Sequence, residues 1–517
     1  MTARPSGALA SLDLRSIVRH DLAASVVVFL VALPLCLGIA HASGAPLAAG
    51  LVTGIVGGVV VGLLSGSSLS VSGPAAGLTV VVLSALDDLG SFGALLLATS
   101  LAGLLQLGLA ALRAGRLAQL FPSPVIRGLL AAIGAILVLK ELPHALGWVG
   151  DFSGDLEFTQ ADGRNTFSEI PFALGHVHPG AAITALVALS LLIAKERVTW
   201  LKDRRWLPGP LLAVGSGAAI HLAFSAWLPS LAVPAGMRIE LPQLGGELFH
   251  APDLSRWNDP TVLRVGFTIA VIASIETLLC VEAVDRLDPE QRRTPPNREL
   301  VAQGLGNLVA GLLGGIPMTA VIVRGSANVQ SGGRSKASSI MHGLWLLLAV
   351  AIGTTVLSHV PLSALAAILI HIGFKLTPPS LFRHMRALGW EQWAPFGITF
   401  VGILVTDLLI GVTIGLVASV ALSLRRTLAE PLAIARDDVG VFRVRLARRI
   451  SFLSRATVRN GLESIEGADV IVLDGTELEY ADRDVVETLH DFARRARERG
   501  VDVQLQSIPQ ITLVPAH

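Results

Sequence analysis

The sequence carries little charge. Only 15% of its 517 residues are Asp, Glu, Lys or Arg, whereas an ordinary soluble domain has about 25%. Hydrophobic residues make up 52% of the chain, and the mean hydropathy is +0.65. This balance excludes a disordered chain, a coiled coil and a typical cytosolic enzyme, and it indicates a protein that crosses a membrane many times. The net charge of +1 gives no reason to expect a nucleic-acid partner.

Cysteine is nearly absent as well. The two cysteines, Cys36 and Cys280, lie in apolar runs, which gives neither a disulfide framework nor a metal cluster and predicts two small buried side chains. The sequence also has no P-loop and no GxSxG, HExxH or CxxC pattern. We therefore expect no catalytic residues, no bound metal or organic cofactor, and no ATP-hydrolysing motor in this chain.

Apolar runs follow one another up to residue 426. A membrane span needs about 20 apolar residues, or fewer where the segment is broken and enclosed by protein. Residues 1–20 are polar and basic, and no obvious cleavage site follows the first run, so we expect a cytoplasmic N-terminal segment rather than a signal peptide. We predict fourteen segments, near residues 22–43, 45–64, 74–88, 91–113, 124–141, 180–195, 208–228, 262–283, 299–314, 325–333, 338–357, 360–373, 393–406 and 408–424.

The charged residues between these runs indicate an orientation. Lys and Arg gather in alternate loops, for example at 195–205, 286–298 and 425–426, while the opposite loops hold 87–88 and the acidic stretch 151–169. Because positively charged loops stay in the cytoplasm, this alternation predicts a multi-pass protein in the lipid bilayer of a bacterial-type inner membrane, with both termini cytoplasmic.

Glycine and proline interrupt two segments at corresponding positions of two halves of seven. The third segment is interrupted over residues 70–77 (SVSGPAAG), and the tenth over 316–319 (IPMT) and 324–328 (RGSAN). Paired interruptions of this kind indicate an inverted-repeat transporter and its binding site. Each predicts a short extended piece followed by a half-helix, and two half-helix N-termini with free N–H groups suit an anion. The alternative is that these residues only kink closely packed helices.

Few ionisable residues lie inside the predicted spans. Glu276 lies in the middle of the eighth segment, where a charge costs roughly 2.5–3.5 kcal/mol on insertion scales. Glu276 could carry a proton, because desolvation disfavours a charged carboxyl. It could instead bind Na⁺ beside Thr277, or be a neutral structural residue. Lys140 and Glu141 adjoin at the end of a span, and we expect a solvated pair.

Arg324 opens the second half-helix, next to Gly325 and Ser326. Its planar guanidinium stays charged and suits oxyanions, so Arg324 is a candidate anion ligand. The alternative is an arginine that reaches the membrane interface. Asn328 and Gln330 are polar residues of the same short segment, and we predict that they shape or gate the site.

The composition changes after residue 426. Residues 436–517 are charged and alternate as in a soluble α/β domain. We predict a buried strand at 470–473, an amphipathic helix at 482–499 and a second strand at 501–505. The chain is therefore expected to comprise a transmembrane domain at 21–426 and a small cytoplasmic domain.

These motifs together resemble the sulfate permease (SulP) family of anion transporters over essentially the whole chain. The residues that carry the resemblance are 31–34 (VALP) and 38–40 (GIA), 70–76 (SVSGPAA), 274–279 (SIETLL) and 328–333 (NVQSGG). The resemblance implies two inverted repeats of seven segments, with a core of segments 1–4 and 8–11 and a gate of segments 5–7 and 12–14. It also implies a C-terminal STAS domain, here short, and a homodimer.

The resemblance places the substrate between segments one, three, eight and ten. The matching residues are Ile39, Gly73, Pro74, Ala75, Arg324, Gly325 and Ser326. Glu276 falls on the family's acidic residue, which is linked to cation coupling. Sodium-coupled bicarbonate members carry Asp there and Thr a turn later, where this chain has Cys280. The missing oxygen weakens a Na⁺ site, so we favour H⁺ as the coupling ion, with Na⁺ possible.

The predicted function is secondary active transport of a small inorganic or carboxylate anion by alternating access, with bicarbonate or sulfate the first candidates. Sodium-coupled bicarbonate uptake, an anion exchanger or channel, a dicarboxylate transporter and a nucleobase–proton symporter of the same architecture stay open, as does a sensor role through the STAS-like domain. Segment one departs from the family pattern at Leu35 and Ile39. Arg483 stands where soluble STAS relatives carry a phosphorylatable Ser.

Overall fold

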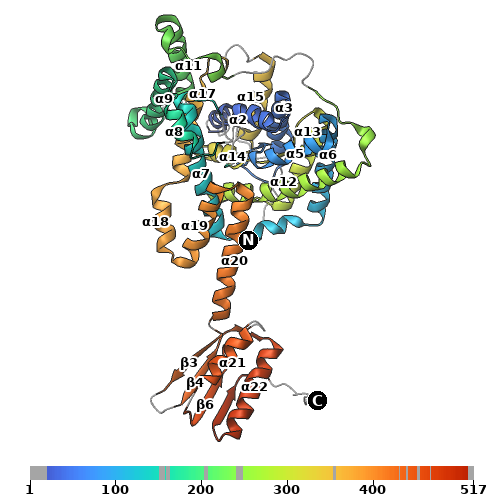
Figure 1. Cartoon of the computed structure of the whole chain (residues 1–517), viewed down its shortest axis with the longest axis vertical. Helices are drawn as coiled ribbons and strands as arrows, with labels where there is room; N and C mark the ends of the chain where they lie inside the picture. The colour runs from blue at the N-terminus through green and yellow to red at the C-terminus, as the bar shows by residue number, and fades with distance from the viewer. Residues whose placement is uncertain are drawn as a thin grey trace. The chain divides into compact units, whose positions relative to one another are not determined.

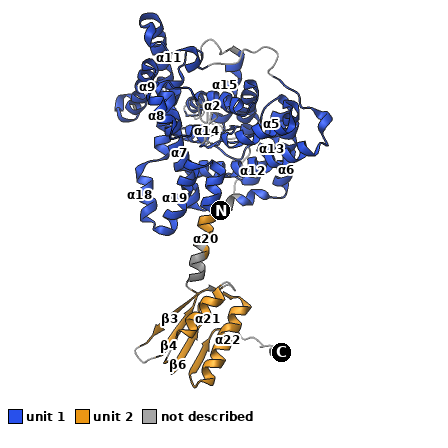
Figure 2. Cartoon of the chain, in the orientation of Figure 1, with its two compact units in different colours: residues 1–416 blue, residues 417–517 orange. Residues whose placement is uncertain are grey.

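The computed structural model describes residues 20–150, 158, 164–202, 208–239, 249–352, 357–429, 431–437, 441–450, 454–465 and 467–509. It divides into two compact units, residues 1–416 and 417–517 (Figure 2).

The first unit consists of helices with two very short strands (Figure 1). Its first half contains α2 (Leu22–Ala42), α3 (Leu47–Val56), the π-helical turn η2 (Gly57–Val61), α4 (Gly62–Leu64), β1 (Ser72–Pro74), the 3-10 turn η3 (Ala76–Leu78), α5 (Thr79–Leu89), α6 (Phe92–Ala111), η4 (Ala114–Leu120), α7 (Ser123–Leu146), α8 (Glu169–Leu174), α9 (Pro179–Arg197), α10 (Thr199–Lys202) and α11 (Gly209–Trp227). Three short 3-10 turns follow, η5 (Pro229–Leu231), η6 (Ala235–Met237) and η7 (Leu254–Arg256).

The second half repeats this order of elements. It contains α12 (Pro260–Leu287), α13 (Pro296–Leu313), β2 (Met318–Ala320), α14 (Ile322–Gln330), α15 (Ala337–Ile352), α17 (Leu362–Leu376), α18 (Pro379–Ala387), α19 (Trp390–Val405) and α20 (Leu408–Ala429). In the described part of the chain, the fourteen predicted segments correspond to α2, α3–α4, β1–α5, α6, α7, α9, α11, α12, α13, β2–α14, α15, α17, α19 and α20. The predicted fold class, a helical polytopic membrane protein, is confirmed.

The helices of the first unit form two groups. One group contains α2, α3, α5, α6 and α12 to α15, and the other contains α7, α9, α11, α17 and α19 (Figure 1). Glycines allow the closest crossings in both groups. A Cβ on Gly103 of α6 would lie 2.5 Å from the Gly304 carbonyl oxygen of α13, and a Cβ on Gly134 of α7 would lie 2.7 Å from the Gly373 carbonyl oxygen of α17. Such contacts between small residues replace the hydrophobic effect as the packing force within a bilayer.

Two expectations about the helices are wrong. The half-helix predicted at 325–333 begins earlier, at Ile322, because Val321 is extended and already follows strand β2. Lys140 and Glu141, predicted to be a solvated pair, are buried: Lys140 is 2% exposed and Glu141 is 0% exposed. The reason is that α7 continues through Pro143 to Leu146, so both residues lie inside the helix rather than at its end.

The second unit is an α/β fold. Strands β3 (Leu432–Arg436), β4 (Phe442–Leu446), β6 (Val470–Asp474) and β8 (Asp502–Gln506) form a sheet in the order β3-β4-β6-β8. Strand β3 runs antiparallel to β4, and the other neighbours are parallel. The short strands β5 (Arg449–Ile450) and β7 (Tyr480–Ala481) pair separately. Helices α21 (Arg455–Glu463) and α22 (Arg483–Glu498) bury Val458, Val485, Leu489 and Phe492 with the sheet residues Val444 and Leu473.

Candidate functional site

The two interrupted segments meet as a pair of antiparallel strands in the interior of the first unit. Strand β1 pairs antiparallel with β2, so that Ser72 lies opposite Ala320, Gly73 opposite Thr319 and Pro74 opposite Met318. Both strands are fully buried. Extended backbone inside a bilayer needs partners for every N–H and C=O group. Mutual pairing satisfies half of these groups, since alternate residues of an antiparallel pair point their groups away from the partner strand.

Side chains of the neighbouring helices satisfy the groups that point away. Asn307 of α13 accepts a hydrogen bond from the Met318 N–H at 2.8 Å and donates one to the Met318 carbonyl at 3.1 Å. Thr277 of α12 accepts one from the Ala320 N–H at 3.3 Å. Pro74, opposite Met318, has no N–H to satisfy at this position. The broken backbone is therefore held in place by polar side chains of unbroken helices.

A small cavity lies where the two half-helices begin. Its volume is about 20 Å³, which is room for about one water molecule. The lining residues come from both helix groups, and they are Leu35 and Ile39 of α2, Ala76 of η3, Glu276 and Cys280 of α12, Val321 to Val323 at the start of α14, Ile133 of α7 and Leu408 of α20. In this conformation the cavity is too small for an anion, so side chains or helices must move before one binds.

Glu276 borders this cavity and faces the turn that begins the first half-helix. It is 5% exposed, and its Oε2 atom has no hydrogen-bond partner among the described residues. A Cβ on Gly77 would lie 3.0 Å from Oε1 and 3.2 Å from Oε2, so only a glycine leaves the carboxyl this close to η3. A buried carboxyl without a partner is stable only when it is neutral or when a cation lies beside it.

Arg324 is fully buried, but it does not line the small cavity. Its Nη2 atom lies 3.4 Å from the sulfur of Cys36 on α2. A Cβ on Gly73 would lie only 1.9 Å from Nη1, so the guanidinium rests on the backbone of β1. Its Nε and Nη1 atoms have no hydrogen-bond partner in the described part of the chain. Glu276 and Arg324 therefore lie on different sides of the start of α14.

The remaining predicted site residues separate into three places. Ile39 lines the small cavity, while Gly73, Pro74 and Ala75 form the extended piece and its exit. Gly325 packs on α12, since a Cβ there would lie 2.6 Å from Val284. Ser326 is buried with no partner for its hydroxyl among the described residues.

Asn328 and Gln330, predicted to shape or gate the site, have different surroundings. The Asn328 amide donates to the Leu69 carbonyl at 2.9 Å, which ties α14 to the chain before β1. Gln330 lines a second, larger cavity of about 410 Å³ between α2, α9, α11, α14 and α17. Thr277, predicted beside Glu276 for a cation, accepts the Ala320 N–H of β2 with its hydroxyl oxygen.

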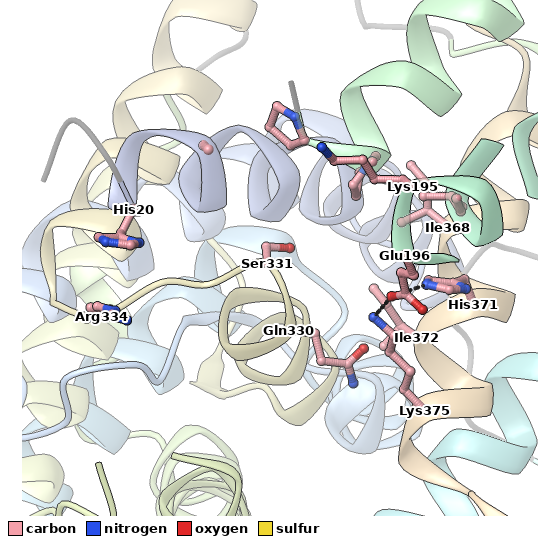
Figure 3. Close-up of a pocket in the computed structure, with 15 residues that line it drawn as sticks. His20, Lys195, Glu196, Gln330, Ser331, Arg334, Ile368, His371, Ile372 and Lys375 are labelled. Carbon is pink, nitrogen blue, oxygen red and sulfur yellow. Dashed lines mark hydrogen bonds and ion pairs between the residues drawn. The ribbon is translucent and has the colours of Figure 1, made fainter. Parts of the chain in front are cut away.

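The larger cavity is rich in basic residues (Figure 3). The residues that carry ionisable groups are His20, Lys195, Glu196, Arg334, His371 and Lys375. Glu196 pairs with Lys375 and accepts a hydrogen bond from His371 Nε2 at 3.0 Å (Figure 3). One carboxylate among several cationic groups leaves a positive potential, which concentrates anions.

His342 of α15 is a buried polar residue that the sequence patterns did not single out. It is 0% exposed, and neither ring nitrogen has a hydrogen-bond partner within the described residues. It lies in an apolar run, SIMHGLWLLL, and a histidine there resembles any other packed residue. The signal that could have indicated it is the rarity of an ionisable residue inside a span.

Comparison with known proteins identifies the family. The model of the sulfate permease family matches residues 18–390. The bicarbonate transporter BicA of Picosynechococcus is 25% identical over 419 residues, covering 79% of this chain and 70% of BicA. The sodium-independent sulfate anion transporter of Bos taurus is 23% identical, covering 92% of this chain and 82% of that protein.

A solved structure has the same fold. It is that of murine solute carrier 26 family member A9, an anion transporter in the inward-facing state, with a TM-score of 0.66 and 17% identity. The match covers 98% of this chain and 90% of that structure. The family consists of transporters rather than enzymes. The chain belongs to the sulfate permease family and is a multi-pass membrane protein of anion transport.

Proposed function

We propose that this protein carries bicarbonate or sulfate across the inner membrane together with a proton, which binds to Glu276. The observation that carries the proposal is the position of Glu276: it is buried, lacks a partner at Oε2 among the described residues, and borders the cavity between the two half-helix starts. The N-termini of two half-helices favour negative charge. An unprotonated Glu276 would compete with the anion for this positive potential, and a protonated one would not.

Proton coupling would overcome the membrane potential that opposes anion entry. An inside-negative potential of about 100 mV opposes entry of a monovalent anion by about 2.3 kcal/mol, which is about fifty-fold in concentration. A proton that moves with a monovalent anion cancels this term. The neutral loaded site also removes the cost of moving an uncompensated buried charge.

The residue one turn after Glu276 favours H⁺ over Na⁺ as the coupling ion. Cys280 lies one turn later on α12 and lines the same cavity. Sulfur is a soft ligand, whereas Na⁺ prefers hard oxygen donors. The Thr277 oxygen already gives one of its two lone pairs to the Ala320 N–H, which leaves only one for a cation.

Alternating access assigns a role to each cavity. The core would be α2–α6 with α12–α15, and the gate would be α7–α11 with α17–α20. The small cavity lies where residues of both groups meet, and the larger basic cavity lies between α2, α14 and the gate helices α9, α11 and α17. Lys195, Arg334 and Lys375 of the larger cavity belong to the predicted cytoplasmic loops or helix ends. We therefore assign this cavity as the cytoplasmic vestibule, with both chain termini on the same side.

The second unit is proposed to be a STAS-type domain that contributes to a homodimer. Its support is the parallel strand order β4-β6-β8 with α22 packed on it. A cross-linking test on the full chain in membranes, compared with a chain that ends at residue 426, would give the dimer in the first and a weaker yield in the second.

Tracer uptake into proteoliposomes tests the function. Labelled bicarbonate, sulfate and fumarate would each be offered under an inward proton gradient, an inward sodium gradient and neither. We expect accumulation of bicarbonate or sulfate under the proton gradient alone. Accumulation that requires sodium would contradict proton coupling, and equal exchange under all three conditions would indicate an exchanger.

A further inference from the structure

We infer that His342 is a second proton-binding residue of the transporter, and that its protonation is coupled to anion binding through the charge of Arg324. The inference rests on the proposed proton coupling and extends it. Two buried side chains, the cationic Arg324 and the titratable His342, lie along one face of the second segment. In this part of the chain both side chains lack the partners that buried polar groups normally have.

Two glycines one turn apart create the space for these side chains. A Cβ on Gly54 of α3 would lie 4.0 Å from Arg324 Nη1, and a Cβ on Gly58 of η2 would lie 2.9 Å from His342 Nδ1. Residues four apart lie on the same helix face, separated by about 6 Å along the axis. Arg324 and His342 therefore pack near successive turns of one surface, where the Cys36 sulfur and Leu346 Cδ1 lie closer to Gly54 than the guanidinium does.

The packing around His342 is tight and mostly apolar. Helix α15 crosses η2 so closely that a Cβ on Gly58 would lie 2.5 Å from the Gly343 Cα. The turn η2 is π-helical, a local form that is frequent at functional sites. The Ser339 carbonyl lies near the ring but outside hydrogen-bonding geometry.

The charged and titratable groups around the ring are few. Segments α3, η2 and α4, which pack against α15, contain no ionisable residue. Helix α2 presents the Cys36 thiol, which contacts Arg324 rather than His342, and carries Asp21 and His41 at its two ends. The Asp21 carboxylate binds the Arg334 and Ser335 backbone. Arg324 is thus the charge that acts most directly on His342.

This arrangement makes proton and anion binding cooperative. Burial disfavours a positive charge on the His342 ring, and repulsion from an uncompensated Arg324 adds to that cost. An anion that enters at the start of α14 offsets the positive charge, and the repulsion falls. Coupling between two sites is reciprocal, so a proton on His342 strengthens anion binding by the same factor. For two unit charges between about 6 and 10 Å apart, an effective dielectric constant of about 20 gives a factor of about tenfold to a hundredfold.

A polar path gives the proton access from the predicted cytoplasmic side. Ser339 lies one turn before His342 on α15, and its hydroxyl has no hydrogen-bond partner among the described residues. A Cβ on Gly62 would lie 3.3 Å from that hydroxyl, so Ser339 continues the same glycine face. Lys336, just before α15, donates to the Ser65 carbonyl at the end of this face.

Equilibrium exchange of labelled anion tests the inference. Proteoliposomes hold the same pH on both sides, and the half-saturating concentration is measured at about pH 5.5 and about pH 7.5, on either side of the usual histidine pKa. The probes are sulfate, chloride and bicarbonate, each given as the concentration of the anionic form. The variants are His342→Gln, the apolar His342→Met of similar length, Glu276→Gln and the double variant Glu276→Gln/His342→Gln.

A second buried histidine supplies the matched control. His221 of α11 is 4% exposed and its Nε2 lies 3.3 Å from Arg238 Nη1, so His221→Gln removes a comparable residue from the gate. We expect the wild type and His221→Gln to bind at least about fivefold more tightly at the lower pH. Both His342 variants should lose part of this gain, because only Glu276 then binds a proton. The double variant should show no pH dependence.

The outcomes separate this inference from the proposed role of Glu276. If His342→Gln leaves the pH dependence unchanged in both the wild-type and the Glu276→Gln backgrounds, the inference is wrong. If Glu276→Gln changes nothing while His342→Gln removes the pH dependence, the role of Glu276 fails and the inference stands. A wild type whose affinity does not change with pH contradicts both. Elution of each variant as a single species excludes misfolding as the cause.

Discussion

Asn307 offers the sharpest test of how the broken segments are held. The Asn307→Ala variant removes the only side chain seen, within the described residues, to bind both outward-facing groups of Met318. It also removes the donor at 2.8 Å to the Gln106 side-chain oxygen. Three buried polar groups lose a partner, and Asn307 itself is 0% exposed, so water cannot easily replace it.

The magnitude follows from these three groups. An unsatisfied buried group costs about 1–3 kcal/mol, while hydrogen bonds inside membrane proteins average only about 0.6 kcal/mol because their partners find substitutes. Few other groups can replace Asn307 as a hydrogen-bond partner of the extended β2 backbone, since the other edge of β2 pairs with β1. We expect a loss of about 2–6 kcal/mol, which is large for a single substitution.

The assay is the temperature at which purified protein stops eluting as a single species. The control is Thr99→Val on α6, which removes a buried hydroxyl that only bonds the Leu95 carbonyl of its own helix, at 2.9 Å. The control should lose less than about 1 kcal/mol. If Asn307→Ala melts at the temperature of Thr99→Val, the β1–β2 crossing does not depend on its side-chain partners, and this reasoning is refuted.

Two further predictions concern contacts that join distant segments. Gly73→Ala places a methyl group 1.9 Å from the Arg324 guanidinium. We therefore expect the arginine to move and anion exchange to fall at least about tenfold. The control is Gly108→Ala, where an added Cβ meets nothing within 4 Å, and this variant should exchange normally. Asp21→Ala removes the acceptor of two backbone N–H groups and of the Ser335 hydroxyl at 2.6–2.9 Å. It should therefore cost about 2–4 kcal/mol of stability, and a melting temperature equal to that of the wild type would contradict this.

Much of the architecture follows from the sequence because a bilayer restricts the choices. Apolar runs, charged loops and paired Gly/Pro interruptions predict the spans and the two half-helices, since only paired or helical backbone is stable in lipid. The mid-span position of Glu276 likewise predicts a residue with a purpose, and the structure places it on the cavity between the half-helices.

The direction of a buried side chain is what the sequence does not determine. Arg324 is predicted at the anion site because it opens a half-helix, and in the structure its side chain lies against Gly73 and Cys36. Which side it faces depends on the crossing of β1 and β2, segments some 245 residues apart in the chain. The same reason explains Lys140, Glu141 and His342: their burial depends on how far a helix extends and on what packs against it, and local composition contains neither.

The most direct test of the account compares Glu276→Gln with Glu282→Gln. Both carboxyls lie on α12, but Glu282 lies beside the predicted cytoplasmic loop, where it accepts from Arg286 at 3.0 Å. The measurement is anion accumulation in proteoliposomes under an inward proton gradient, together with exchange without a gradient. We predict that Glu276→Gln loses proton-driven accumulation but keeps exchange, while Glu282→Gln keeps both. Proton-driven accumulation by Glu276→Gln at the wild-type level would contradict the central claim.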